Sequence, residues 1–242
     1  MLIHCDNQPI ADALVAIPVY NEARYVDDIM KAVSKHHSNI LVINDGSSDG
    51  TDKLLEKHKF IKVVTHKTNE GYGQSLIDAF AFAVEEDYNW IITMDCDHQH
   101  QPSCIPQFLQ RIEKNDADII SGSRYLLHTD LEKVPADRLQ TNRCITALLN
   151  SVLRLEITDA FCGFKAYRVI ALKKLRLTEK GYGLPLQLWI QAVFAQLRIT
   201  EIPVPLIYHD PKRNFEGSLE IPEYRMKYYM DIIEKELAVY GY

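Results

Sequence analysis

The chain has 242 residues, of which 47% are hydrophobic and 25% are charged, and this composition is typical of one globular domain with a substantial core. Its net charge of −6 disfavours a nucleic-acid-binding surface, so we expect no nucleic-acid partner. The cysteines are scattered, and the N-terminus has no signal-peptide pattern, so we expect a cytoplasmic protein. The apolar runs are shorter than the roughly 18 residues that span a bilayer, so we expect no transmembrane segment.

Short apolar runs alternate with helix-length segments through the first half of the chain. They predict strands at residues 13–19, 39–44, 61–65, 88–94 and 117–122, with helices at 22–35, from about residue 49, and in the remaining intervals. Alternation of this kind indicates an α/β fold, in which a mostly parallel sheet is covered by helices on both faces.

The second half of the chain changes character after Arg124. Its pattern predicts helices at 139–155, 185–197 and 221–240, a segment rich in glycine and aromatic residues at 159–168, and a proline-limited edge strand at 201–209. The last helix carries an apolar stripe that we expect to pack against the core, formed by Tyr224, Tyr228, Ile232 and Leu237.

Polar clusters follow the five strands predicted in the first half. They are PVYNE (18–22), NDGSSDG (44–50), NEGYG (69–73), DCDHQ (95–99) and GSRY (122–125). Turn chemistry explains any one of them, because Gly, Asn, Asp and Ser favour turns. Ligands of a parallel α/β sheet bind beyond the carboxyl ends of its strands, so five clusters at this edge predict a binding site there.

Two aspartates, Asp95 and Asp97, follow a predicted buried strand directly and lie one residue apart from each other. An extended backbone points both carboxylates the same way, so their charges repel unless a cation lies between them. With Gln99 they form an oxygen-ligand set suited to Mg²⁺ or Mn²⁺, ions that often link a protein to a diphosphate. An acidic loop that caps the next helix is the structural alternative, but the neighbouring clusters favour the metal site.

Asp45 lies in the segment NDGSSDGT, where Asp-Gly is also a common turn. We interpret Asp45 as a hydrogen-bond acceptor for the base or ribose of a nucleotide, and Asp49 as the cap of the following helix. His98 and His100 flank the aspartate pair. Loop histidines are usually surface or hydrogen-bonding residues, and we assign these two no ligand role.

Six segments follow one another along the chain: VAIPVYNEARYV, VINDGSSDGT, NEGYGQSL, MDCDHQHQP, GSRY and DAFCGFKAYR. Together, and in this order, they resemble the family-two glycosyltransferases of the GT-A fold. Within that family the chain is most similar to the polyprenyl-phosphate (dolichyl-phosphate) mannosyl- and glucosyltransferases, over about residues 12–210. The resemblance implies one Rossmann-like GT-A domain, with a nucleotide-sugar-binding half at residues 1–125 and an acceptor-side half at residues 126–242.

The resemblance also implies a nucleotide-sugar donor, GDP-mannose or UDP-glucose, and a set of residues that hold it. The positions that match those around the nucleoside are Pro18, Tyr20, Glu22, Ile43 and Asp45. Asp95 and Asp97 match the metal and diphosphate motif, and Gln99 stands where relatives place a third ligand. Arg124 matches the GSRY arginine that is expected near the phosphates or the acceptor.

The acceptor-side motif of the family, Asp-x-x-Ser-Gly-Phe, matches at Asp159, Gly163 and Phe164, with Cys162 in the serine place. Relatives often carry Arg-x-x-Gly-x-Ser-Lys further on, whereas this chain has RNFEGSL at residues 213–219, so the glycine is shifted and the lysine is absent. We expect Arg213, with its neighbour Lys212, to supply the positive charge. Asn44 stands where an aspartate is common, and the transmembrane helices that many relatives append are missing.

The expected reaction is a single inverting displacement at the anomeric carbon, with a lipid phosphate as acceptor and peripheral attachment to the cytoplasmic face of a membrane. The expected catalytic residues are Asp95, Asp97, Arg124, Asp159 and Arg213. An ionised phosphate needs no base, whereas a hydroxyl acceptor does, and Asp159 is the candidate for that case. Two further alternatives are a degenerate transferase that only binds sugar nucleotides, and a HAD-like phosphatase, whose catalytic loop also begins with apolar residues and Asp-x-Asp.

Overall fold

A seven-stranded sheet forms the centre of the molecule, with strand order β3-β2-β1-β4-β6-β5-β7. The computed structural model describes residues 12–126, 131, 134–207 and 217–242. The strands are β1 (Ala13–Val19), β2 (Ile40–Asn44), β3 (Lys62–Thr65), β4 (Trp90–Thr93), β5 (Ile119–Ser123), β6 (Lys165–Arg168) and β7 (Ile199–Pro203). All strands run parallel except β6, which is antiparallel to β4 and β5 on its two sides.

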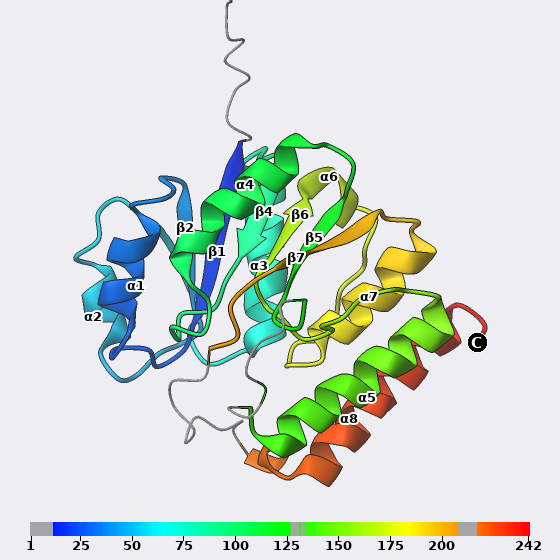
Figure 1. Cartoon of the computed structure of the whole chain (residues 1–242). Helices are drawn as coiled ribbons and strands as arrows, with labels where there is room; N and C mark the ends of the chain where they lie inside the picture. The colour runs from blue at the N-terminus through cyan, green and yellow to red at the C-terminus, as the bar shows by residue number, and fades with distance from the viewer. Residues whose placement is uncertain (1–11, 127–130, 132–133, 208–216) are drawn as a thin grey trace, which may run out of the picture.

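Helices cover both faces of this sheet (Figure 1). The first five are α1 (Val26–Val33), α2 (Thr51–Leu55), α3 (Tyr72–Glu85), α4 (Ile105–Glu113) and α5 (Ala136–Leu153). They are followed by α6 (Val169–Leu172), α7 (Leu184–Phe194) and α8 (Pro222–Val239), and short 3-10 turns lie at η1 (Pro102–Cys104) and η3 (Gly217–Glu220). The long helices α5 and α8 lie side by side and pack against α7 in the second half of the chain.

The strands form two hydrophobic cores because their side chains alternate between the faces. In β1, Leu14 and Ala16 belong to the core shared with α3, α7 and α8, whereas Val15 and Ile17 belong to the core shared with α1 and α4. All of these side chains are completely buried, as expected for a parallel sheet covered on both sides. The loops at the strand ends therefore carry most of the polar chemistry.

The sequence pattern predicted these strands closely, and the structure confirms the α/β fold. The strand predicted at 201–209 overlaps β7, which begins two residues earlier, at Ile199, ends at Pro203, and forms one edge of the sheet. The helix predicted to start at residue 22 starts at Val26, because the carbonyl of Glu22 accepts the backbone N–H groups of Tyr25 and Val26 in a turn. Sequence reasoning missed β6, which lies inside the segment 159–168.

The apolar stripe predicted for α8 is wrong at its first position. Tyr224 is 59% exposed, whereas Tyr228, Ile232 and Leu237 pack against the core. The line of α8 that is most deeply buried is instead Arg225, Tyr229, Ile233 and Glu236. Its two charged members are paired, since Arg225 donates to Asp137, and Glu236 accepts hydrogen bonds from Gln187 and Gln191. The helix thus buries a partly polar face, which hydrophobic periodicity cannot reveal.

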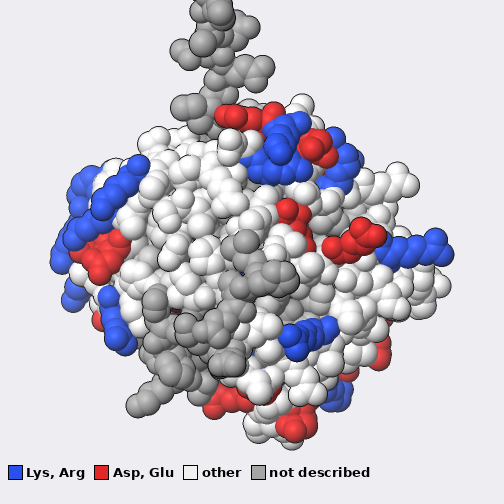
Figure 2. Space-filling view, in the orientation of Figure 1, with Lys and Arg blue, Asp and Glu red and all other residues white. Residues whose placement is uncertain are grey.

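Charged side chains of both signs are interspersed around the rim of the face shown in Figure 2. Among the described residues, no helix is long and apolar enough to cross a membrane.

Candidate active site

A cavity of about 660 Å³ lies beyond the carboxyl ends of the parallel strands. Each strand-end cluster predicted from the sequence contributes to its wall: residues 18–22 after β1, Asp45 after β2, Asn69 and Gly71 after β3, residues 95–97 and Gln99 after β4, and Arg124 and Tyr125 after β5. The antiparallel direction of β6 brings the residues that precede it to the same edge, which places Phe161 in the wall as well. The structure therefore brings together clusters that lie far apart in the sequence.

Asp45 is 3% exposed, and its carboxylate accepts three hydrogen bonds. Its Oδ1 accepts the Glu70 N–H at 2.7 Å and lies 2.7 Å from His66 Nδ1, while its Oδ2 accepts the Gly71 N–H at 2.9 Å. The other imidazole nitrogen of His66 lies 2.9 Å from Asp78 Oδ2. Burial lowers the pKa of His66, but the two carboxylates outweigh it and raise that pKa above its ordinary value. Asp45 is thus fixed at the cavity wall by hydrogen bonds to both of its carboxylate oxygens.

The N-terminus of α3 packs directly against the segment 179–181. At Gly71, whose φ is +106°, an added Cβ would lie 2.4 Å from the carbonyl oxygen of Lys180, and at Gly73 it would lie 2.3 Å from that of Glu179. Only glycine permits this approach and, at Gly71, this backbone conformation. The contact brings Tyr182 over Tyr72 with ring centroids 5.6 Å apart and nearly parallel planes.

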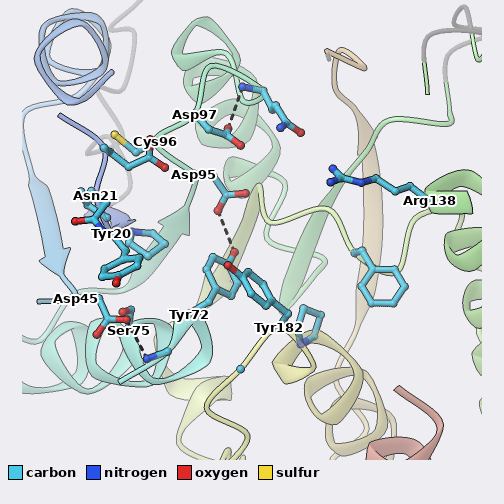
Figure 3. Close-up of a pocket in the computed structure, with 18 of the residues that line it drawn as sticks. Tyr20, Asn21, Asp45, Tyr72, Ser75, Asp95, Cys96, Asp97, Arg138 and Tyr182 are labelled. Atoms are coloured by element: carbon cyan, nitrogen blue, oxygen red, sulfur yellow. Dashed lines mark hydrogen bonds between the residues drawn. The ribbon is translucent and has the colours of Figure 1, made fainter. Parts of the chain in front are cut away.

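Asp95 is held by Tyr72 and His100 and lies close against Gly163. Tyr72 donates its hydroxyl to Asp95 Oδ1 at 3.0 Å, and the backbone N–H of Asp95 donates to His100 Nδ1 at 2.9 Å (Figure 3 shows the Tyr72 contact). A Cβ at Gly163 would lie 2.9 Å from Asp95 Oδ2, so the glycine of the acceptor-side motif leaves room for this carboxylate. Burial and the charge of Asp95 raise the pKa of Tyr72, so its hydroxyl remains a donor.

Asp97 lies next to Asp95 along the cavity wall, and its Oδ1 accepts the backbone N–H of Gln99 at 3.0 Å. Among the described residues, no group of three or more His, Cys, Asp or Glu side chains is placed to hold a metal by itself. Two carboxylates and an amide nevertheless fit Mg²⁺ or Mn²⁺, because such ions are often held by one or two carboxylates and completed by water and substrate phosphates. Asp95, Asp97 and Gln99 are the residues that would hold the ion.

Arg124 forms a bidentate ion pair with Asp159: its Nε and Nη2 donate to the two carboxylate oxygens at 2.6 and 2.8 Å. Asp159 is completely buried and also accepts the Asn142 Nδ2–H at 2.9 Å. Burial opposes its ionisation, but Arg124 outweighs this and lowers the pKa of Asp159 to about 2. Both carboxylate oxygens accept hydrogen bonds and the pKa is low, which argues against the role of catalytic base that was expected for Asp159 with a hydroxyl acceptor. Asp159 positions Arg124.

The wall opposite Tyr20, Asn21 and Asp45 carries arginines from two helices. Arg138 points into the cavity from α5 (Figure 3), and Arg225 lines it from α8. Arg225 is 2% exposed and donates to Asp137 Oδ2 at 2.6 Å and to the carbonyl of Leu219 at 3.0 Å. Arg143 is exposed on α5 and is not among the described residues that line the cavity.

The remaining predicted residues have mixed positions. Pro18, Tyr20 and Glu22 line the cavity, but Ile43 is completely buried in the core of the sheet and does not line it. Arg213, with Lys212, lies outside the described residues. The N-cap position of α2 is Gly50 and not Asp49, although Asp49 Oδ1 accepts the N–H of Thr51 at the start of the helix at 3.0 Å.

Sequence reasoning missed several cavity residues, among them Ser75, Tyr182, Arg225 and Tyr229. The hydroxyl of Ser75 is buried and has no hydrogen-bond partner among the described residues. Buried polar atoms are nearly always satisfied, so this one is a candidate contact for a ligand. Its position in the first turn of a predicted helix beside Gly71 and Gly73 was the available signal.

Comparison with known proteins decides the family. A match to Glycosyl transferase family 2 spans residues 14–176, which is more than half of the chain. The chain belongs to this family.

Among similar family members, polyprenol monophosphomannose synthase from Mycolicibacterium smegmatis is 29% identical over 209 residues, covering 81% of this chain and 78% of that protein. Undecaprenyl-phosphate mannosyltransferase from Micrococcus luteus is 28% identical over 203 residues, with 80% and 83% covered. A UDP-N-acetylglucosamine–dolichyl-phosphate N-acetylglucosaminyltransferase from Methanococcus voltae is 26% identical, with 82% and 88% covered.

Solved structures of the GT-A fold superpose on this family member. Glucosyl-3-phosphoglycerate synthase from Mycobacterium tuberculosis, crystallised with Mn²⁺, UDP-glucose and phosphoglyceric acid, matches with a TM-score of 0.74 at 16% identity, covering 93% of this chain and 79% of that chain. The same enzyme with Mg²⁺ and UDP matches with a TM-score of 0.68 at 15% identity, covering 93% and 79%. The family match and the fold together exclude the HAD-like phosphatase, which was an alternative from the sequence.

Proposed function

We propose that this glycosyltransferase moves a hexose, mannose or glucose, from a nucleoside-diphosphate sugar to a polyprenyl phosphate, with inversion at the anomeric carbon. The observation that carries the proposal is the division of the cavity into a wall with carboxylates (Asp45, Asp95, Asp97) and an opposite wall with arginines (Arg138, Arg225). The sequence relatives named for polyprenyl- and dolichyl-phosphate transfer support the same acceptor class.

The donor lies on the carboxylate wall, in the half formed by residues 1–125. Pro18, Tyr20, Glu22 and Asp45 surround the nucleoside, and Ser75 is available to hydrogen-bond with it. Asp95, Asp97 and Gln99 would hold Mg²⁺ or Mn²⁺, and the bound ion would supply positive charge that stabilises the departing diphosphate. Structural neighbours crystallised with these ions and UDP support this cofactor.

The acceptor lies on the arginine wall, in the half formed by residues 126–242. Its phosphate is ionised at neutral pH, so its oxygen can attack the anomeric carbon while the bond from that carbon to the diphosphate oxygen breaks. Arg124, Arg138 and Arg225 orient the phosphate and balance its charge. No proton has to be removed, which agrees with Asp159 being committed to Arg124. A lipid acceptor implies action at the periphery of a membrane, on its cytoplasmic face.

A thermal-shift screen followed by transfer assays tests this proposal. GDP-mannose and UDP-glucose are compared with and without Mn²⁺, and the correct donor should raise the melting temperature only when the metal is present. Transfer is then assayed with undecaprenyl phosphate and, as the hydroxyl-acceptor comparison, 3-phosphoglycerate. Transfer to 3-phosphoglycerate alone would overturn the acceptor class. Donor binding without transfer to any acceptor would favour the degenerate sugar-nucleotide-binding protein.

A further inference from the structure

A second hollow adjoins the catalytic cavity. It lies between the segment 181–182, η3 and the first turns of α8, and we call it the α8 groove. Its aromatic and apolar surface comes from Tyr182, Leu219, Tyr224 and Tyr228, and its lining also includes Lys227 and Asp231, which form an ion pair with each other. Tyr182 and Gly181 line both the groove and the cavity, so the two hollows are neighbours that share a wall.

The first turn of α8 faces both hollows with different chemistry. Arg225 lines the cavity, whereas its neighbour Tyr224 lines the groove and is 59% exposed. Ile221, immediately before α8, is 46% exposed, and Tyr182 is 39% exposed. Large apolar side chains that are left in water beside a binding site indicate a surface that something apolar covers.

The groove is held in place by contacts that do not need a ligand. Tyr228 donates its hydroxyl to Glu179 Oε1 at 2.6 Å and accepts the Gly183 N–H at 3.2 Å. A Cβ at Gly181 would lie 2.6 Å from the Tyr228 hydroxyl, so the segment 181–183 sits close against α8. Preformed walls lower the entropic cost of binding a flexible chain.

We propose that the α8 groove binds the first isoprene units of the polyprenyl acceptor, whose phosphate lies in the cavity beside Arg225. This inference rests on the proposed function and names the element that recognises the acceptor. The charge pattern fits an amphiphile: the arginines at the inner end match a phosphate, and the tyrosines at the outer end match a hydrocarbon chain. Tyrosine suits this position because its ring covers apolar surface while its hydroxyl stays hydrogen-bonded or hydrated.

The test compares Tyr224→Ala with the same substitution at Tyr242, which is 73% exposed and lies after the other end of α8. Both side chains are exposed, so neither variant should lose its fold. The acceptor KM is measured for undecaprenyl phosphate. In the same detergent, isopentenyl phosphate, which has a single isoprene unit, is assayed either for its KM as a substrate or for its inhibition constant as a competitive inhibitor. We expect Tyr224→Ala to raise the KM for undecaprenyl phosphate about tenfold, with less than a twofold change for isopentenyl phosphate. Tyr242→Ala should change neither value.

Three results would overturn the inference while leaving the proposed function intact: an unchanged undecaprenyl phosphate KM in Tyr224→Ala, equal losses for both phosphates, or an equal loss in Tyr242→Ala. The last of these would assign the effect to general adsorption on the detergent surface. Failure of the unmodified protein to use undecaprenyl phosphate is a separate outcome, because it rejects the proposed acceptor and the groove assignment with it.

Discussion

The two walls of the cavity are built in opposite ways. On one wall Asp45, Asp95 and Asp97 follow parallel strands directly, and on the other Arg138 and Arg225 extend from helices. Each wall is backed by the opposite charge: His66 stands behind Asp45, and Asp137 stands behind Arg225. The facing charges are thereby fixed before any substrate arrives, which is the arrangement that electrostatic stabilisation requires.

The difference between the walls separates their tasks. Strand ends are held by the sheet ladder, so carboxylates there keep a fixed geometry that suits a metal and a diphosphate. Helices α5 and α8 hold each other through side-chain contacts such as Arg225 to Asp137, so their arginines are positioned by packing. Substitutions on the strand wall should therefore abolish chemistry, whereas substitutions on the helix wall should weaken acceptor binding.

The largest effect is expected at the metal site. Asp97→Ala should lower kcat/KM about a thousandfold, because the charge that balances the leaving diphosphate is lost with the ion. The melting temperature without ligand should stay the same, since Asp97 is partly exposed at the cavity. Asp28→Ala, at an exposed position on α1, is the control and should transfer normally. Undiminished activity of Asp97→Ala after chelation of divalent ions would show that this wall does not work through a metal.

Gly163 tests how finely Asp95 is placed. In Gly163→Ala, the new Cβ would lie 2.9 Å from Asp95 Oδ2 and 2.8 Å from the Tyr72 hydroxyl, so the carboxylate must move. Displacement of a catalytic group by a fraction of an ångström can cost about a hundredfold, and we expect a loss of kcat of that order. The comparison is Gly241→Ala, where no atom lies within 4 Å of the new Cβ. Normal turnover in Gly163→Ala would mean that the position of Asp95 is not critical.

The strand wall could be predicted from the sequence, whereas on the helix wall only Arg138 could be proposed as a phosphate contact and Arg225 was missed. Apolar runs followed by polar clusters located Asp45, Asp95 and Asp97, because a strand end and its loop are contiguous in the chain. Strand β6 was not predicted because it has only four residues and buries Lys165 among apolar neighbours. Its sequence therefore shows no alternation of apolar and polar residues. Arg225 was missed because its approach to the cavity depends on how α8 rotates against α5. Tyr224 was assigned to the core for the same reason.

The helix wall is tested by Arg225→Gln. A charge-assisted hydrogen bond to a phosphate contributes about 2 kcal/mol, so the acceptor KM should rise roughly thirtyfold. Donor affinity in the thermal-shift assay should remain unchanged, which would separate the two walls. Arg143→Gln, the same change at an exposed position of α5, is the control. A lower melting temperature with an unchanged acceptor KM would assign Arg225 to the α5–α8 contact alone.

Ser75→Ala sharpens the donor side of the comparison. The buried hydroxyl has no partner among the described residues, so its removal should not destabilise the protein without ligand. If the donor supplies the missing hydrogen bond, its affinity should fall about fivefold, as expected for one neutral hydrogen bond. Calorimetric titration of Ser75→Ala and of the unmodified protein with the preferred sugar nucleotide measures this change in affinity. An unchanged affinity would place the nucleoside away from the first turn of α3.

The smallest effect concerns the cation behind the carboxylate wall. The pKa of His66 is raised above its ordinary 6.5 in the folded protein, because Asp45 and Asp78 outweigh the effect of burial. A raised folded pKa gives stability that is fully present below pH 6.5 and is lost as the pH rises through the folded pKa. His66→Gln should therefore lower the melting temperature by a few degrees at pH 6 and by less at pH 9. His36→Gln, at an exposed position, should show no such trend. A deficit in His66→Gln that grew with pH would mean that the neutral imidazole, and not the cation, holds Asp45 in the wall.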